Sequence, residues 1–190
     1  ARAALRKDWR MATPRGGFLG EQFRPLDRVG VYIPGGTAPL VSTALMTACL
    51  ARAAGVSSIV ACTPAGKSGS VNSFVLHAMQ AAGVTEIYRI GGVMAVGALA
   101  YGTRTIARVQ NIVGPGNAYV TAAKKLVYGQ VALDSIAGPS EVAILADDSA
   151  DPRHVAADLL AQAEHGTGEE KALLVTTSVQ LARAVERELH

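Results

Sequence analysis

Short apolar runs alternate along this chain with longer segments in which apolar residues recur at helical spacing. A β-branched run, a turn containing glycine, a helical segment and a second glycine recur roughly every 25 to 30 residues. Strands are predicted at 29–33, 57–62, 86–90, 108–113, 131–136, 142–146 and 172–176. Helices are predicted at 1–11, 42–54, 71–82, 93–101, 118–128, 152–165 and 178–190.

This alternation of strands and helices is typical of an α/β protein with a doubly wound parallel sheet, the Rossmann-like class. Ligands of such sheets collect at the carboxyl ends of the strands. Turns containing glycine follow four of the predicted strands, at 34–36, 66–69, 91–92 and 114–116. The sequence therefore predicts a binding edge for a nucleotide-sized ligand.

Composition agrees with buried parallel strands, because 49% of the residues are hydrophobic and only 17% are charged. The net charge of +3 comes from scattered basic residues, so no nucleic-acid surface is predicted. No apolar run is long enough for a membrane-spanning helix. Cys49 and Cys62 lie in apolar surroundings, and nothing else indicates a disulfide-stapled domain. Without an initiator Met or a signal-peptide pattern, the chain reads as an internal fragment.

Residues 114–117 (Gly-Pro-Gly-Asn) form the most suggestive turn, because they lie between a predicted strand and a predicted helix. Glycine lets the backbone approach a ligand closely, and a helix N-terminus offers N–H groups to it. Asn117 adds an amide that can bind a polar ligand. An ordinary turn with Asn117 as the helix N-cap explains the same residues equally well.

A second phosphate-binding pattern competes with this turn. Residues 61–68 (Ala-Cys-Thr-Pro-Ala-Gly-Lys-Ser) nearly match a P-loop, with Ala61 in place of the first glycine. The strand at 142–146 and Asp147 could supply the matching magnesium ligand. A solvated Pro-Gly loop is favoured over a nucleotide-hydrolysing site, because patterns this short recur by chance.

Two further groups of polar residues lie in the last third of the chain. Ser140 and Glu141 follow a Gly-Pro turn, where Ser140 either contacts a substrate or bonds to its own turn. Gln162 and His165 lie three positions apart and share one face near a helix end. From the residues alone, His165 is favoured as a helix-end residue that interacts with the last carbonyl groups, rather than as a metal ligand.

Five motifs in the same order resemble the histidinol dehydrogenase family over essentially the whole chain. They are residues 31–36 (Val-Tyr-Ile-Pro-Gly-Gly), 98–103 (Ala-Leu-Ala-Tyr-Gly-Thr), 113–117 (Val-Gly-Pro-Gly-Asn), 137–142 (Ala-Gly-Pro-Ser-Glu-Val) and 158–165 (Asp-Leu-Leu-Ala-Gln-Ala-Glu-His). The resemblance implies a cytoplasmic, homodimeric, zinc-dependent enzyme of histidine biosynthesis. Such an enzyme oxidises L-histidinol through L-histidinaldehyde to L-histidine in two hydride transfers to NAD.

The resemblance also implies roles for particular residues. Tyr32 and Asn117 would contact NAD, and Ser140 would contact the substrate. Gln162 and His165 would ligate zinc, and through the metal they would hold the substrate. By analogy, residues 29–142 form a complete cofactor-binding Rossmann-like domain. Residues 1–28 and 143–190 would belong to a second, similar domain that is incomplete here.

The chain departs from the family pattern in two respects. Met94 stands where the family usually has a glutamine that contacts NAD, and a thioether cannot make the hydrogen bonds of an amide. The family's Glu-His acid–base pair and two further zinc ligands are expected beyond His190, so no catalytic residue is assigned within this chain and the chain alone is expected to be inactive. A related dehydrogenase of another polar alcohol and a non-catalytic structural domain therefore stay open.

Overall fold

In the computed structural model, residues 1–35, 39–66, 68–138, 140–164 and 170–190 are described. The chain divides into two compact units, Ala1–Ile136 and Ala137–His190, which we call unit 1 and unit 2. No helix in the described part of the chain is long and apolar enough to cross a membrane.

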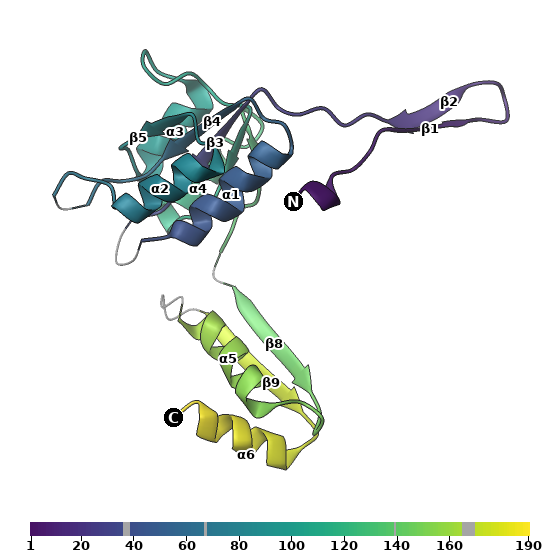
Figure 1. Ribbon diagram of the computed structural model, residues 1–190, viewed down its shortest axis with the longest axis vertical. Coiled ribbons are helices and arrows are strands. Elements are labelled where there is room, and N and C mark those ends of the chain that lie inside the picture. Colours follow the sequence, from purple (N-terminus) through teal and green to yellow (C-terminus); the bar gives the residue numbers. More distant parts are fainter. Residues whose placement is uncertain (36–38, 67, 139, 165–169) are drawn as a thin grey trace. The chain divides into compact units, whose positions relative to one another are not determined.

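Unit 1 is built on a parallel five-stranded sheet in the order β5-β4-β3-β6-β7, and Figure 1 labels β3, β4 and β5. Its strands are β3 (Arg28–Tyr32), β4 (Ser58–Cys62), β5 (Glu86–Tyr88), β6 (Asn111–Val113) and β7 (Ala132–Leu133). The chain runs outward from β3 to β5 and then returns to the other side of β3. This reversal between β3 and β6 is the topological switch point of a Rossmann-like sheet, so the predicted fold class is confirmed.

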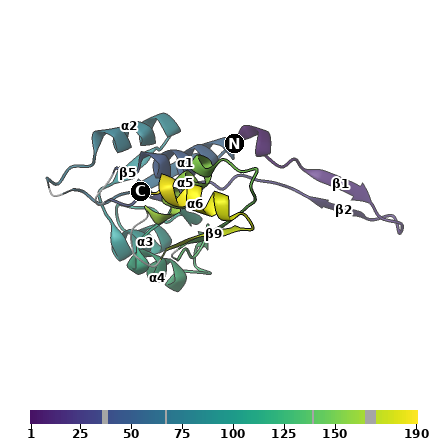
Figure 2. The same ribbon diagram turned by 90° about the horizontal axis from the view of Figure 1, so that it is seen from below.

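Four helices cover the two faces of this sheet (Figure 2). Helices α1 (Val41–Ala53) and α2 (Ser73–Ala82) pack on one face, and α3 (Gly92–Tyr101) and α4 (Ala118–Leu126) pack on the other. The strands are buried on both faces because alternate side chains point to opposite sides: Val31 meets α1 and α2, whereas Tyr32 meets α3 and α4. The apolar runs predicted from the sequence form this core.

The first 28 residues differ from the prediction. A helix was expected at 1–11, but only η1 (Arg2–Ala4) is helical, and β1 (Trp9–Ala12) pairs antiparallel with β2 (Phe18–Glu21). Glu21 secures the hairpin, because its Oε2 accepts hydrogen bonds from Trp9 Nε1 at 2.7 Å and Arg6 Nη2 at 2.8 Å. Every residue of both strands is exposed. A short helix without an apolar face to bury is only marginally stable, so the hairpin contacts prevail.

Unit 2 contains two parallel strands and two helices. Strand β8 (Glu141–Ala146) pairs with β9 (Lys171–Thr176), and α5 (Pro152–Ala163) and α6 (Val179–Glu188) pack on one face of the pair. Asp151 caps α5, whose first residue is Pro152, as predicted. The other face of the strands is open within this unit, since Leu145 is 84% exposed. The expected domain grouping of 1–28 with 143–190 stays a prediction.

Candidate functional site

The carboxyl ends of β3 and β6 lie side by side at the switch point, where Gly114, the first residue of the turn at 114–117, lies against the backbone of Tyr32. Gly114 has φ +116°, and a Cβ at this position would lie 2.1 Å from the carbonyl oxygen of Tyr32. Only glycine allows this close approach of two backbones. The turn and Tyr32, which the sequence singled out separately, therefore lie together.

Tyr32 connects the turn to the neighbouring helix α3. Its side chain is only 4% exposed, and its hydroxyl oxygen accepts a hydrogen bond from the N–H of Gly92 at 3.1 Å. Gly92 begins α3, and the N-cap residue Gly91 makes no side-chain capping bond. Met94 lies in the first turn of this helix and is 72% exposed. Tyr32, the start of α3 and Met94 therefore belong to one region of the predicted binding edge.

Asn117 is the N-cap of α4. Its Oδ1 accepts a hydrogen bond from the N–H of Val120 at 3.1 Å. Asn117 is therefore the helix N-cap, which is the structural alternative that the sequence offered for this residue. The cap uses only the carbonyl oxygen of the amide, so Nδ2 is not involved in it. Because Asn117 is exposed, a cap and a ligand contact are compatible in the same side chain.

Lys124 and Asp134 form hydrogen bonds with the backbone of the turn at Gly114. The sequence did not predict a role for either residue. The N–H of Gly114 donates to Asp134 Oδ2 at 2.7 Å, and Lys124 Nζ donates to the carbonyl oxygen of Gly114 at 3.0 Å. Lys124 also pairs with Asp134 Oδ1 at 2.5 Å. A lysine in the last turn of a helix and an aspartate after a two-residue strand carry no sequence signal. Only the fold brings them to Gly114.

The loop after β4 does not have the geometry of a P-loop. In a P-loop, the helix begins at the Lys-Ser pair, so that its N-terminal N–H groups surround the phosphate. Here α2 begins at Ser73, after its N-cap Asn72. The N–H of Gly66 instead donates to the carbonyl oxygen of Ser70 at 2.8 Å, which closes the loop on itself. Lys67 lies outside the described residues.

The described residues of unit 1 line several cavities, and two of them bear on the location of the site. A cavity of about 230 Å³ lies between the loops after β3 and β4, beside Gly35 and Pro64. Pro64 packs so closely on Gly35 and Gly91 that a Cβ at either glycine would lie within 2.7 Å of it. A larger apolar cavity of about 690 Å³ lies beside α1 and residues 23–26. Its lining contains none of the residues predicted from the sequence to bind a ligand, so we do not assign the site to it.

In unit 2 the fold brings Ser140 and Gln162 together. Gln162 Nε2, near the end of α5, donates a hydrogen bond to the carbonyl oxygen of Ser140 at 2.9 Å. This bond fixes the amide and leaves Oε1, the Lewis-basic atom of the side chain, outside the contact. His165 lies outside the described residues, and the described ones contain no cluster of three or more His, Cys, Asp or Glu side chains that could hold a metal.

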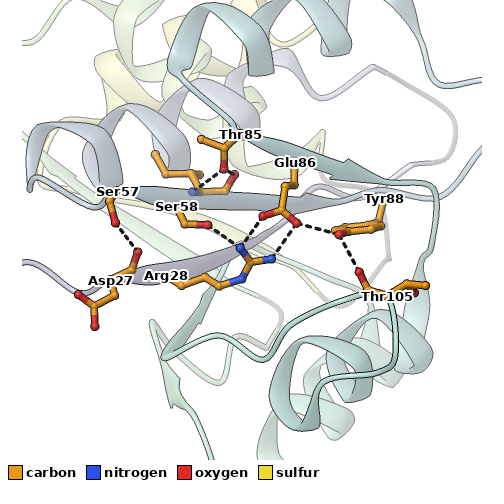
Figure 3. A network of polar contacts seen from close by, with 9 residues as sticks. Asp27, Arg28, Ser57, Ser58, Thr85, Glu86, Tyr88 and Thr105 are labelled. Atoms are coloured by element: carbon orange, nitrogen blue, oxygen red, sulfur yellow. Dashed lines mark hydrogen bonds and ion pairs between the residues drawn. The ribbon is translucent and has the colours of Figure 1, made fainter.

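A polar network lies at the opposite, amino edge of the sheet in unit 1 (Figure 3). Arg28, at the start of β3, donates to both carboxylate oxygens of Glu86, at 2.5 and 2.8 Å, and to Ser58 Oγ at 2.6 Å. The guanidinium and the hydroxyl of Tyr88 lower the pKa of Glu86 to about 2. The carboxylate in turn raises the pKa of Arg28 and of Tyr88. Because this network ties three strand starts together away from the glycine turns, we assign it a structural role.

Comparisons with known proteins agree with the motifs and the fold. The model of the histidinol dehydrogenase family matches residues 1–190. The chain belongs to this family. It is 55% identical to a histidinol dehydrogenase from a Synechococcus strain, over 97% of this chain and 42% of that protein. It is 50% identical to a histidinol dehydrogenase from Oceanobacillus iheyensis, over 98% of this chain and 43% of that protein.

A solved structure supports the same membership. The crystal structure of histidinol dehydrogenase from Elizabethkingia anophelis matches with a TM-score of 0.92 and 41% identity, over 99% of this chain and 43% of that chain. The present chain thus spans about two-fifths of the length of the relatives it matches. Its resemblance to histidinol dehydrogenases, first inferred from five motifs, is confirmed.

Proposed function

We propose that this chain is the part of a histidinol dehydrogenase that binds NAD and supplies part of a zinc site. The reaction is the two-step oxidation of L-histidinol through L-histidinaldehyde to L-histidine. The observation that carries the proposal is the family match over all 190 residues, joined to a glycine turn at the switch point of a Rossmann-like sheet. On family grounds alone, we extend the proposal to a homodimer.

The turn at 114–117 and the start of α3 are the proposed contacts for NAD, which accepts hydride when bound. Asn117 would donate from Nδ2 to the cofactor while Oδ1 keeps α4 capped. Tyr32 is buried and its hydroxyl is bonded to Gly92. Tyr32 would therefore act mainly by fixing the start of α3. Met94 would lie against the cofactor through an apolar contact instead of the usual amide.

Gln162 and His165 in unit 2 would supply only part of the ligand set of a zinc ion. A zinc ion held there would serve to orient the substrate. Gln162 is held by Ser140 so that its carbonyl oxygen can act as a ligand, and a neutral His165 imidazole is an ordinary zinc ligand. Zinc, when bound, acts as a template that orients the substrate. Ser140 and Gln162 would thereby hold the amino alcohol in one position, while completion of the site requires further ligands.

Replacing Asn117 by Asp tests the cofactor assignment without removing the cap. Aspartate caps helices as well as asparagine does, so the melting temperature should change little. Loss of the Nδ2 donors and addition of a negative charge should weaken NAD binding by about tenfold, which corresponds to about 1.4 kcal/mol. Isothermal titration of the purified chain with NAD measures the affinity.

Gln180→Glu is the matched control, because it makes the same amide-to-carboxylate exchange in the first turn of α6, in unit 2. It should leave the affinity for NAD unchanged. Equal affinities of the wild-type chain and Asn117→Asp would contradict the role of Asn117. Stabilisation of the chain by ATP–magnesium, but not by NAD, would contradict the cofactor itself.

A further inference from the structure

Lys124 is a buried cation for which the proposed chemistry has no use. Its side chain is 3% exposed, and Nζ lies within hydrogen-bond distance of Gly114 O and Asp134 Oδ1. An ammonium group enclosed in this way cannot reach a ligand in solvent. Burying a charge is unfavourable unless it is paired and hydrogen-bonded. The position of Lys124 therefore requires an explanation other than direct binding.

Lys124 and its ion-pair partner Asp134 both form hydrogen bonds with one residue of the turn, Gly114. Lys124 Nζ donates a hydrogen bond to the carbonyl oxygen of Gly114, while Asp134 Oδ2 accepts one from the N–H of the same residue. Asp134 is itself fixed, because its N–H donates to Ile112 O and its Oδ1 accepts from the N–H of Ser135. The two side chains thus clamp the peptide groups on both sides of the glycine whose φ is +116°.

We propose that Lys124 and Asp134 are positioning residues for NAD, and this inference rests on the proposed function. By fixing Gly114 they set the path of residues 115–117 and the direction in which Asn117 and the N-terminus of α4 face the cofactor. The turn is then organised before binding, so less conformational entropy is lost when the cofactor binds. Because the pair is internally neutralised, it contributes geometry rather than attraction for phosphate.

Two variants test the clamp, and their melting temperatures show whether they remain folded. Lys124→Met releases the carbonyl side of Gly114 and also removes the cation that pairs with Asp134. The double variant Lys124→Met/Asp134→Leu releases both sides and replaces a buried ion pair by apolar groups of similar size, an exchange that often preserves stability. Affinity for NAD should fall in the order wild type, single variant, double variant, with a loss of about tenfold or more in the double variant.

Lys125→Met is the matched control, because Lys125 is the exposed neighbour in the same helix turn. It removes the same charge without touching Gly114, and its affinity for NAD should stay within about twofold of wild type. Equal losses in Lys125→Met and Lys124→Met would show general charge attraction and overturn the inference.

Hydrogen exchange of the Gly114 amide provides a readout that overall stability does not supply. In protein labelled with ¹⁵N-glycine, this amide should exchange faster in the double variant than in wild type, because its carboxylate acceptor is gone. An unchanged rate would overturn the clamp. Unchanged NAD affinity in folded variants would overturn the positioning role alone. Absence of NAD binding by the wild-type chain would instead overturn the proposed function, and this inference with it.

Discussion

Replacing Glu86 by Gln tests how much the network at the amino edge of the sheet stabilises unit 1. Glu86 accepts two hydrogen bonds from Arg28 and lies 2.7 Å from the hydroxyl oxygen of Tyr88. These contacts lower the pKa of its carboxyl group from 4.5 to about 2. At 1.36 kcal/mol per pH unit, this difference corresponds to at most about 3.4 kcal/mol. Because the side chain is 36% exposed, solvent screening reduces the expected value to about 1 to 2 kcal/mol.

The sign of the pH dependence follows from the lowered pKa. The folded protein holds Glu86 ionised at pH values where the unfolded chain already binds a proton. The stabilisation is therefore complete above about pH 4.5 and is lost as pH falls toward about 2. By about pH 3, more than half of it should be gone. The free-energy difference between wild type and Glu86→Gln should shrink accordingly.

Urea unfolding followed by far-ultraviolet circular dichroism, at about pH 7 and about pH 3, measures this difference. Other carboxyl groups titrate alike in both proteins and cancel in the comparison. Glu186→Gln is the control, because Glu186 is exposed on α6 and the described residues give it no ion pair. A free-energy difference for Glu86→Gln that is the same at both pH values would refute the reasoning.

Two further predictions concern the cysteines and the metal. Burial raises the pKa of the Cys62 thiol to about 12, so at neutral pH a thiol reagent should modify exposed Cys49 in the native chain and Cys62 only after unfolding. The single-cysteine variants Cys49→Ser and Cys62→Ala allow the modification rate of each thiol to be measured separately. Comparable modification rates in the two native variants would contradict this. In the complete protein, His165→Asn should lose zinc by elemental analysis, whereas His154→Asn, on the exposed side of α5, should keep it. Stoichiometric zinc in His165→Asn would count against the ligand assignment.

The sequence by itself predicted the strands of the sheet and the glycine turns at their carboxyl ends, although the structure shortens several strands. A parallel strand that is buried on both faces needs apolar side chains at nearly every position. Such strands therefore stand out in the sequence as short apolar runs followed by turns that contain glycine. The sequence also indicated where helices end. Gly83 ends α2 at φ +93°, a conformation that glycine adopts without strain. The motifs around Tyr32, Asn117, Ser140 and Gln162 also revealed the family, because several long matches in one order are specific.

Tertiary structure alone decided which of these residues meet. Local propensity favoured a helix at 1–11, but Glu21 draws Trp9 and Arg6 into a hairpin. No sequence pattern marks Lys124 or Asp134 as important. They meet at Gly114 only because β7 pairs with β6 and α4 packs over the sheet. Sequence spacing reports periodicity along one element, whereas contacts between elements depend on how the elements pack. The turn at 114–117 was therefore predictable, and the ion pair that holds it was not.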